Sequence, residues 1–93
     1  MSTMDSALLQ AEIETEETTV DVRKLIIHND DHNTFEWVIE TLIRVCRHSA
    51  EQAEQCSYII HSKGKYAVKH GTYNTLRPMK EAIAERGINV TIE

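Results

Sequence analysis

The chain has few of the residues on which simple reactive sites are built. It contains one proline, three glycines and two cysteines, and the cysteines have no CxxC spacing. A phosphate-binding loop needs a glycine-rich backbone, which is missing here. Cys46 and Cys56 fall within helical patterns. They are predicted to be small core residues in a reducing compartment, so we expect the cytoplasm.

Long hydrophobic runs are also missing. No stretch approaches the ~20 apolar residues of a membrane span, and no basic-then-apolar signal peptide begins the chain. With 93 residues, 41% of them hydrophobic, the sequence predicts one small domain with a real core. We expect a monomer that does not bind membranes.

Positive charge is absent from the first part of the chain. Residues 1–20 hold five acidic residues and no Lys or Arg, and the remaining 73 residues hold ten acids and ten bases. The net charge of −5 therefore belongs to the first segment. A neutral domain offers no phosphate-neutralising patch, so we expect no nucleic-acid binding. We predict a flexible acidic extension over 1–20 and a core domain over 21–93.

Hydrophobic periodicity predicts six elements in the order β-α-α-β-α-β. The first helix is expected to begin at Asn33 or Thr34, since Asn33 and Glu36 have capping-box spacing. Pro78 is tolerable in the first turn of the third helix if Asn74 or Thr75 caps it. The predicted ranges are strand 22–28, helix from 33 or 34, helix 49–63, strand 66–70, helix 75–86 and strand 88–92. This order predicts an α+β fold of two layers, with helices on one face of a three-stranded antiparallel sheet.

The first strand runs into a loop of unusual polarity. His28 to Asn33 are six consecutive polar residues without Gly or Pro, more hydrogen-bonding side chains than a turn needs. Four potential metal ligands lie within it (His28, Asp30, Asp31 and His32), and His61 is a fifth. Crowding in sequence does not give a coordination geometry, and the HxxxH spacing of zincins is missing. We therefore expect no metal, cofactor or nucleophilic centre.

Binding of a cation is the stronger functional interpretation of this loop. Carboxylates and amides hold cations by charge-assisted hydrogen bonds. The loop leads directly to Phe35 and Val38, the first buried-face residues of the next helix. An acidic rim beside an apolar hollow suits a peptide N-terminus with a large first side chain. The alternative, which stays open on these grounds, is a solvated capping loop beside ordinary core.

Three segments together resemble a known family. Asn29-Asp30-Asp31 follows a strand, Phe35-Glu36-Trp37-Val38-Ile39 opens a helix, and Ile60-His61-x-x-Gly64-Lys65 ends the next one. This combination is similar to ClpS, the adaptor that hands N-degron substrates to a Clp AAA+ protease. The resemblance covers about residues 22–93.

The resemblance implies a site and its partners. Asn29, Asp30 and His61 would bind the α-amino group of the substrate, with Asp31 and Asn33 in supporting positions. The resemblance also implies an adaptor rather than an enzyme, a ClpA- or ClpC-type unfoldase, and substrates that begin with Leu, Phe, Tyr or Trp. The walls of the apolar pocket would be Phe35, Val38, Ser57, Ile60 and Ile88.

The chain departs from the family pattern at two pocket positions. Phe35 and Ser57 stand where methionines are common, and the third helix is shorter than usual. A second interpretation is an interaction domain, because the element order also resembles the C-terminal domain of the ribosomal stalk protein. Small metalloenzymes form a third class, which a metal-free preparation that keeps its fold would exclude.

Overall fold

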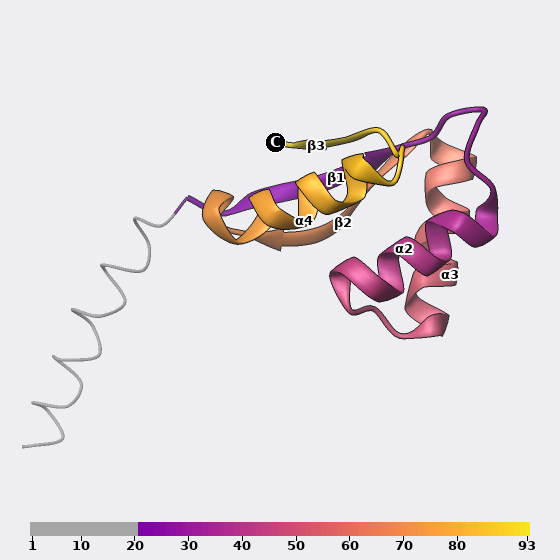
Figure 1. Ribbon diagram of the computed structural model, residues 1–93, viewed down its shortest axis with the longest axis horizontal. Coiled ribbons are helices and arrows are strands. Elements are labelled where there is room, and N and C mark those ends of the chain that lie inside the picture. The colour runs from indigo at the N-terminus through magenta and orange to yellow at the C-terminus, as the bar shows by residue number, and fades with distance from the viewer. Residues whose placement is uncertain (1–20) are drawn as a thin grey trace, which may run out of the picture.

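The computed structural model describes residues 21–93, and its elements follow the predicted β-α-α-β-α-β order (Figure 1). The prediction of a flexible extension over residues 1–20 lies outside the described residues. The bounds are β1 Arg23–His28, α2 Phe35–Cys46, α3 Ala50–Lys63, β2 Lys65–Gly71, α4 Tyr73–Glu85 and β3 Val90–Ile92.

The strands form one antiparallel sheet in the order β2-β1-β3. β1 is central, with His28 opposite Lys65 of β2 and Leu25 opposite Ile92 of β3. A register shift lies between Leu25 and Ile26. The predicted three-stranded antiparallel sheet is confirmed.

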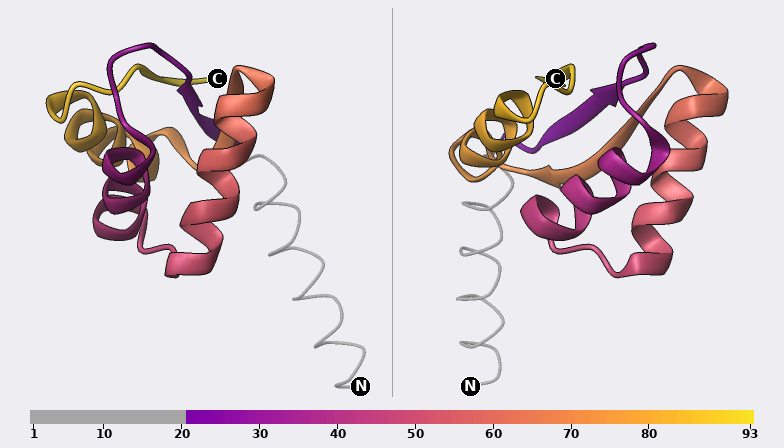
Figure 2. Two further views of the ribbon diagram at one scale, coloured as in Figure 1. Left: turned by 90° about the vertical axis from the view of Figure 1, so that its right-hand side faces the viewer. Right: turned by 45° about the vertical axis from the view of Figure 1, so that its right-hand side comes forward.

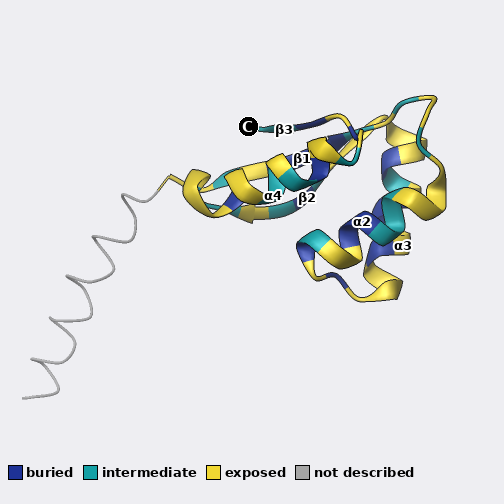
Figure 3. Cartoon of the chain, viewed as in Figure 1, coloured by how far each residue is buried: buried dark blue, intermediate teal, exposed yellow. Residues whose placement is uncertain are grey.

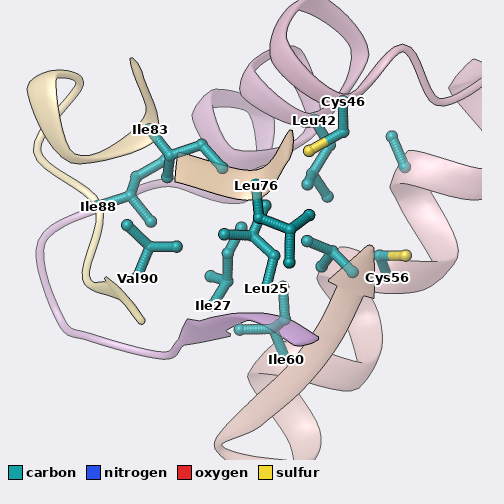
Figure 4. Close-up of a cluster of buried hydrophobic side chains, with 12 residues drawn as sticks. Leu25, Ile27, Leu42, Cys46, Cys56, Ile60, Leu76, Ile83, Ile88 and Val90 are labelled. Atoms are coloured by element: carbon teal, nitrogen blue, oxygen red, sulfur yellow. The ribbon is translucent and has the colours of Figure 1, made fainter. Parts of the chain in front are cut away.

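The helices cover one face of this sheet. α2 and α3 lie side by side, while α4 runs along the strands (Figures 1 and 2). Leu25 and Ile27 of β1 enter the core, whereas Ile26 between them is buried outside that cluster, as alternation along a strand requires. Figure 4 shows these side chains meeting Leu76 of α4 and Ile60 of α3. The two-layer architecture is therefore confirmed.

Buried and exposed residues alternate along α2 and α3, as expected for amphipathic helices packed on one side (Figure 3). The two cysteines are free and buried at the packed side of these helices. Burial raises the pKa of Cys46 to about 11 and also raises the pKa of Cys56. Both thiols therefore stay protonated at neutral pH, as core residues do.

The predicted caps of two helices are wrong. Thr34 rather than Asn33 caps α2, and its hydroxyl accepts a hydrogen bond from the backbone N–H of Trp37 at 3.1 Å. Thr72 caps α4, one turn before the predicted start at Thr75. Pro78 is therefore the sixth residue of α4, beyond the first turn. Asn74, whose carbonyl has no amide from Pro78 to accept, is exposed and can bind water instead.

The last strand is shorter than the alternation over 88–92 predicts. The strand β3 itself comprises Val90–Ile92, which lie opposite Leu25–Ile27 of β1. Ile88 instead closes the end of α4, where its backbone N–H donates to Ile83 O at 3.4 Å and its side chain is 3% exposed. In contrast, the predicted end of α3 at Lys63 is confirmed, because Gly64 follows with a left-handed φ of 94°.

Candidate functional site

The polar loop between β1 and α2 is held in place by backbone hydrogen bonds to two distant segments. Asn29 N donates to Gly64 O at 2.8 Å, and His28 N donates to Asn89 O at 2.9 Å. The first bond joins the loop to the end of α3, and the second joins it to the segment before β3. These two bonds therefore position the loop against the end of α3 and against the segment before β3.

Asp30 organises the loop internally. Its Oδ1 accepts hydrogen bonds from the backbone N–H of His32 at 2.8 Å and of Asn33 at 2.9 Å. Its Oδ2 accepts a third from the Asn33 side-chain amide at 2.7 Å. The Asn33 backbone N–H is the largest cause that lowers the pKa of Asp30 below its ordinary value of 3.8, against a smaller opposing effect of burial. The carboxylate is charged throughout the neutral range.

Asn33 connects the loop to a third segment, and this explains why it does not cap α2. Its side-chain amide donates both to Asp30 and to the carbonyl of Gly87 at 3.0 Å. Gly87 lies 54 residues along the chain, in the turn after α4. The Asn33 side chain is thus committed to the loop, and Thr34 takes the capping role.

His61 reaches the same place from α3. It lies in the last turn of that helix, and its ring meets the ring of Phe35 edge-on, with centroids 6.2 Å apart. The bond between Asn29 and Gly64 fixes this helix end beside the loop. The structure therefore brings together Asn29, Asp30 and His61, which lie up to 32 residues apart in the sequence.

These residues surround a hollow of about 330 Å³. The polar part of its wall comes mainly from the loop and from His61, while the apolar part comes from α2 and α3. The hollow is lined by Asn29, Asp30, Asp31, Asn33, Thr34, Phe35, Val38, Ser57, Ile60 and His61. A volume of this size is within the range of small-molecule binding sites.

Nine of the ten sequence-predicted site residues line this hollow, and Ile88 does not. Figure 4 shows Ile88 beside Ile83 and Val90 in the core. Thr34 is the lining residue that the sequence interpretation omitted, although its place before a helical pattern was a usable signal.

A cation–π contact between Arg86 and Trp37 holds α2 against the turn after α4. The Arg86 guanidinium lies 4.0 Å from the ring centroid of Trp37, and Trp37 Nε1 donates to Arg86 O at 2.9 Å. Arg86 Nε also donates to the buried Thr41 hydroxyl at 2.7 Å. Nothing local in the sequence indicates this contact, because its partners are more than forty residues apart.

The chemistry that this arrangement can perform is recognition of a cation next to an apolar group. Within residues 21–93, no three His, Cys, Asp or Glu side chains are placed to share a metal ion. The His28 ring, a candidate ligand by sequence, is instead within 2.8 Å of the Thr91 hydroxyl. No helix in the described part of the chain is long and apolar enough to cross a membrane.

Comparison with known proteins assigns the chain to a family. The family described as ATP-dependent Clp protease adaptor protein ClpS matches residues 18–91. The chain belongs to the ClpS family. Family membership confirms the resemblance stated on the three sequence motifs, and the stalk-protein alternative is no longer needed to explain the order of elements.

Two ClpS relatives and one solved structure show how similar the chain is to other members. The ClpS adapter protein of Acetivibrio thermocellus is 37% identical over 75 residues, which cover 75% of each chain. That of Desulforapulum autotrophicum is 34% identical over 55 residues, covering 59% of this chain and 53% of the relative. The structure of Agrobacterium tumefaciens ClpS2 bound to L-phenylalaninamide matches with a TM-score of 0.71 and 26% identity, covering 77% of this chain and 94% of that one.

Proposed function

We propose that this member of the ClpS family binds the first residue of N-degron substrates and delivers them to a ClpA- or ClpC-type AAA+ unfoldase. The observation that carries the proposal is the placement of Asn29, Asp30 and His61 around one hollow with the apolar side chains of Phe35, Val38 and Ile60. The Asp30 carboxylate supplies the negative charge that attracts an α-ammonium group. The hollow beside it takes the first side chain.

The ligand of the related Agrobacterium protein supports this assignment. L-phenylalaninamide carries a free α-amino group and a benzyl side chain on one carbon atom, with an amide where a peptide continues. A substrate that begins with Leu, Phe, Tyr or Trp has the same two groups in the same relation. In this proposal Phe35, Val38 and Ile60 contact the side chain, while Asp31, Asn33 and Thr34 shape the loop.

The expected binding free energy fits an adaptor that captures a substrate and then releases it. Burying one Leu- or Phe-sized side chain contributes about 1.5–3 kcal/mol. Each hydrogen bond to a charged group contributes about 1.5–3 kcal/mol. One buried side chain and two or three such bonds sum to about 4.5–12 kcal/mol before the cost of association, and only the upper part of that range, less a cost of about 4 kcal/mol, reaches the roughly 8 kcal/mol of micromolar affinity. The protein acts as an adaptor and not as an enzyme, and its buried free thiols fit a reducing cytoplasm.

Calorimetric titration with peptides that differ only at the first residue tests the binding step. We expect micromolar binding of a Leu or Phe peptide, and at least tenfold weaker binding of the Ala peptide and of the N-acetylated Leu peptide. Equal binding of all these peptides would rule out recognition of the first residue. Degradation of an N-degron reporter by ClpAP- or ClpCP-type protease, with and without this protein, tests delivery and identifies the unfoldase.

A further inference from the structure

The hydroxyl of Ser57 is a buried polar group that the proposed function leaves without a role. Ser57 is 3% exposed, and its Oγ has no hydrogen-bond partner among the described residues. A serine within a helix commonly donates to the carbonyl four residues earlier, here Ala53, but Ser57 does not. Ser62 on the same helix does so normally, donating to Tyr58 O at 2.9 Å.

An unpaired buried hydroxyl costs free energy, so it calls for a physical explanation. Ser57 lines the hollow, and the apolar part of the same wall is formed by Phe35, Val38 and Ile60. These side chains offer no hydrogen-bond partner to the hydroxyl. A ligand that enters the hollow is therefore the natural source of one.

The position of Ser57 on α3 defines which part of a ligand it meets. Ser57 precedes His61 by four residues, so the two lie on the same face of α3, about 6 Å apart along the helix axis. His61 is at the end of the hollow where the α-amino group binds in the proposed function. Ser57 is one turn farther from that end, so in the proposed binding mode it is the side chain of α3 that would face the outer atoms of a long first side chain.

We propose that Ser57 is a specificity-determining residue that hydrogen-bonds the phenolic hydroxyl of an N-terminal tyrosine. This inference rests on the proposed function and narrows its substrate class. Tyrosine carries its hydroxyl at the end of the ring most distant from the α-amino group, and that hydroxyl both donates and accepts. Leucine and phenylalanine have no such atom, so they leave Ser57 unpaired.

The burial of the Ser57 hydroxyl in the free protein determines how much more tightly a Tyr peptide binds than a Phe peptide. Most hydrogen bonds contribute little net free energy because both partners give up bonds to water. The Ser57 hydroxyl is already removed from solvent, so only the tyrosine hydroxyl loses water on binding. We expect an N-terminal Tyr peptide to bind about five- to tenfold more tightly than the matching Phe peptide. A wholly apolar hollow would favour Phe, because the tyrosine hydroxyl would be buried unpaired.

Calorimetric titration of two peptides that differ only in Tyr or Phe at the first position tests the inference on the full chain. For Ser57→Ala we expect the preference for the Tyr peptide over the Phe peptide to disappear or reverse. Alanine is a better helix former than serine, so the variant should keep its fold. Ser62→Ala, which removes the exposed hydroxyl one turn along α3, is the matched control and should keep the wild-type ratio.

The outcomes separate the inference from the function on which it rests. A Tyr-to-Phe ratio that is the same in the wild type and in Ser57→Ala overturns the role of Ser57, whatever its value. If the acetylated Tyr peptide binds as well as the free one, first-residue recognition itself fails and the inference fails with it. Ser57→Met adds a second variant: the larger side chain removes the hydroxyl and should also abolish the Tyr preference.

Discussion

Asp30 has two tasks in one side chain. Three hydrogen bonds from His32 and Asn33 to its carboxylate fold the loop, and its negative charge lies at the hollow. Asp31, the next residue, also lines the hollow but is exposed. The two neighbouring carboxylates thus differ in how firmly they are held, and a charge held in a fixed position binds a ligand group better than a mobile one.

The first prediction compares these two aspartates. Asp30→Asn should weaken binding of a Phe peptide at least tenfold, because a charge-assisted hydrogen bond contributes about 1.5–3 kcal/mol. Asp31→Asn should change the affinity less than threefold. Calorimetry of both variants with one peptide measures the difference. Equal losses would contradict the assignment of Asp30 to the α-amino group.

The second prediction concerns pH. The pKa of Asp30 is lowered, so this carboxylate does not titrate between pH 6 and 10. The free peptide α-amino group has a pKa of about 7.7–8.0, and binding beside a carboxylate raises it. Affinity should therefore be complete below about pH 7.5 and fall as the pH rises above the free pKa. Titrations from pH 6.5 to 9.5 measure this, and in Asp30→Asn the decline should be shallower.

At the scale of elements, three contacts to the turn after α4 support the site. Asn33 donates to Gly87 O, Trp37 donates to Arg86 O, and the Arg86 side chain packs on the Trp37 ring. Arg86 also lies 3.7 Å from Glu40 of α2. This turn therefore fixes both the loop and the first turns of α2 relative to the sheet.

The third prediction tests that support. Arg86→Met should lower the free energy of unfolding by about 1–3 kcal/mol, because it removes the contact to Trp37 and leaves the buried Thr41 hydroxyl without its donor. Arg77→Met is the matched control on α4, since its pair with Glu81 is exposed and contributes about 0.5 kcal/mol or less. Urea unfolding followed by circular dichroism measures both. Similar losses would show that the contact to α2 is unimportant.

The sequence predicted the elements well because each one carries a local signal. Period-two and helical patterns located the three strands and three helices, and Gly64 marked the end of α3. The errors arose where a residue takes part in contacts distant in sequence. Asn33 was expected to cap α2, but its amide is engaged by Asp30 and by Gly87. Ile88 was expected in a strand, but it is drawn into the core beside Ile83.

The site was predicted partly from the polarity of the loop and partly from the family resemblance. Polarity without glycine or proline drew attention to the loop, but nothing local connected Asn29 with His61; the family resemblance made that connection. The structure supplies its physical basis in the bond from Asn29 N to Gly64 O, which ties the loop to the end of α3. The support from Arg86 and the unpaired Ser57 hydroxyl had no sequence signal, because both depend on tertiary packing.

The described part of the molecule has one core, to which all six elements contribute. Leu25, Leu42 and Leu76 are fully buried where the layers meet. A domain of this size has an unfolding free energy of about 5–15 kcal/mol, so the loss of a single central contact lowers the stability of the whole domain. The hollow is built on α2 and α3, whose inner sides form part of that core.

The fourth prediction follows from the shared core. Leu42→Ala should cost about 2–5 kcal/mol and lower the melting temperature by roughly 10 °C or more. Ile43→Ala, at the neighbouring position on α2 with 37% of its surface exposed, should cost much less. Thermal unfolding measured by calorimetry distinguishes them. A comparable change in both variants would mean that α2 is not anchored through Leu42.

Trp37 gives the protein a built-in optical reporter. It is the only tryptophan in the chain, its indole is partly exposed, and a guanidinium lies 4.0 Å from its ring centre. Indole emission depends on the polarity and charge around the ring, so intrinsic fluorescence reports on this junction between α2 and the turn after α4. Trp37 lies two residues after Phe35 and so does not share its face of α2, which means that the emission reports on the contact with Arg86 rather than on the hollow itself. The packing of α2 against the turn after α4 can thus be observed in the unmodified protein.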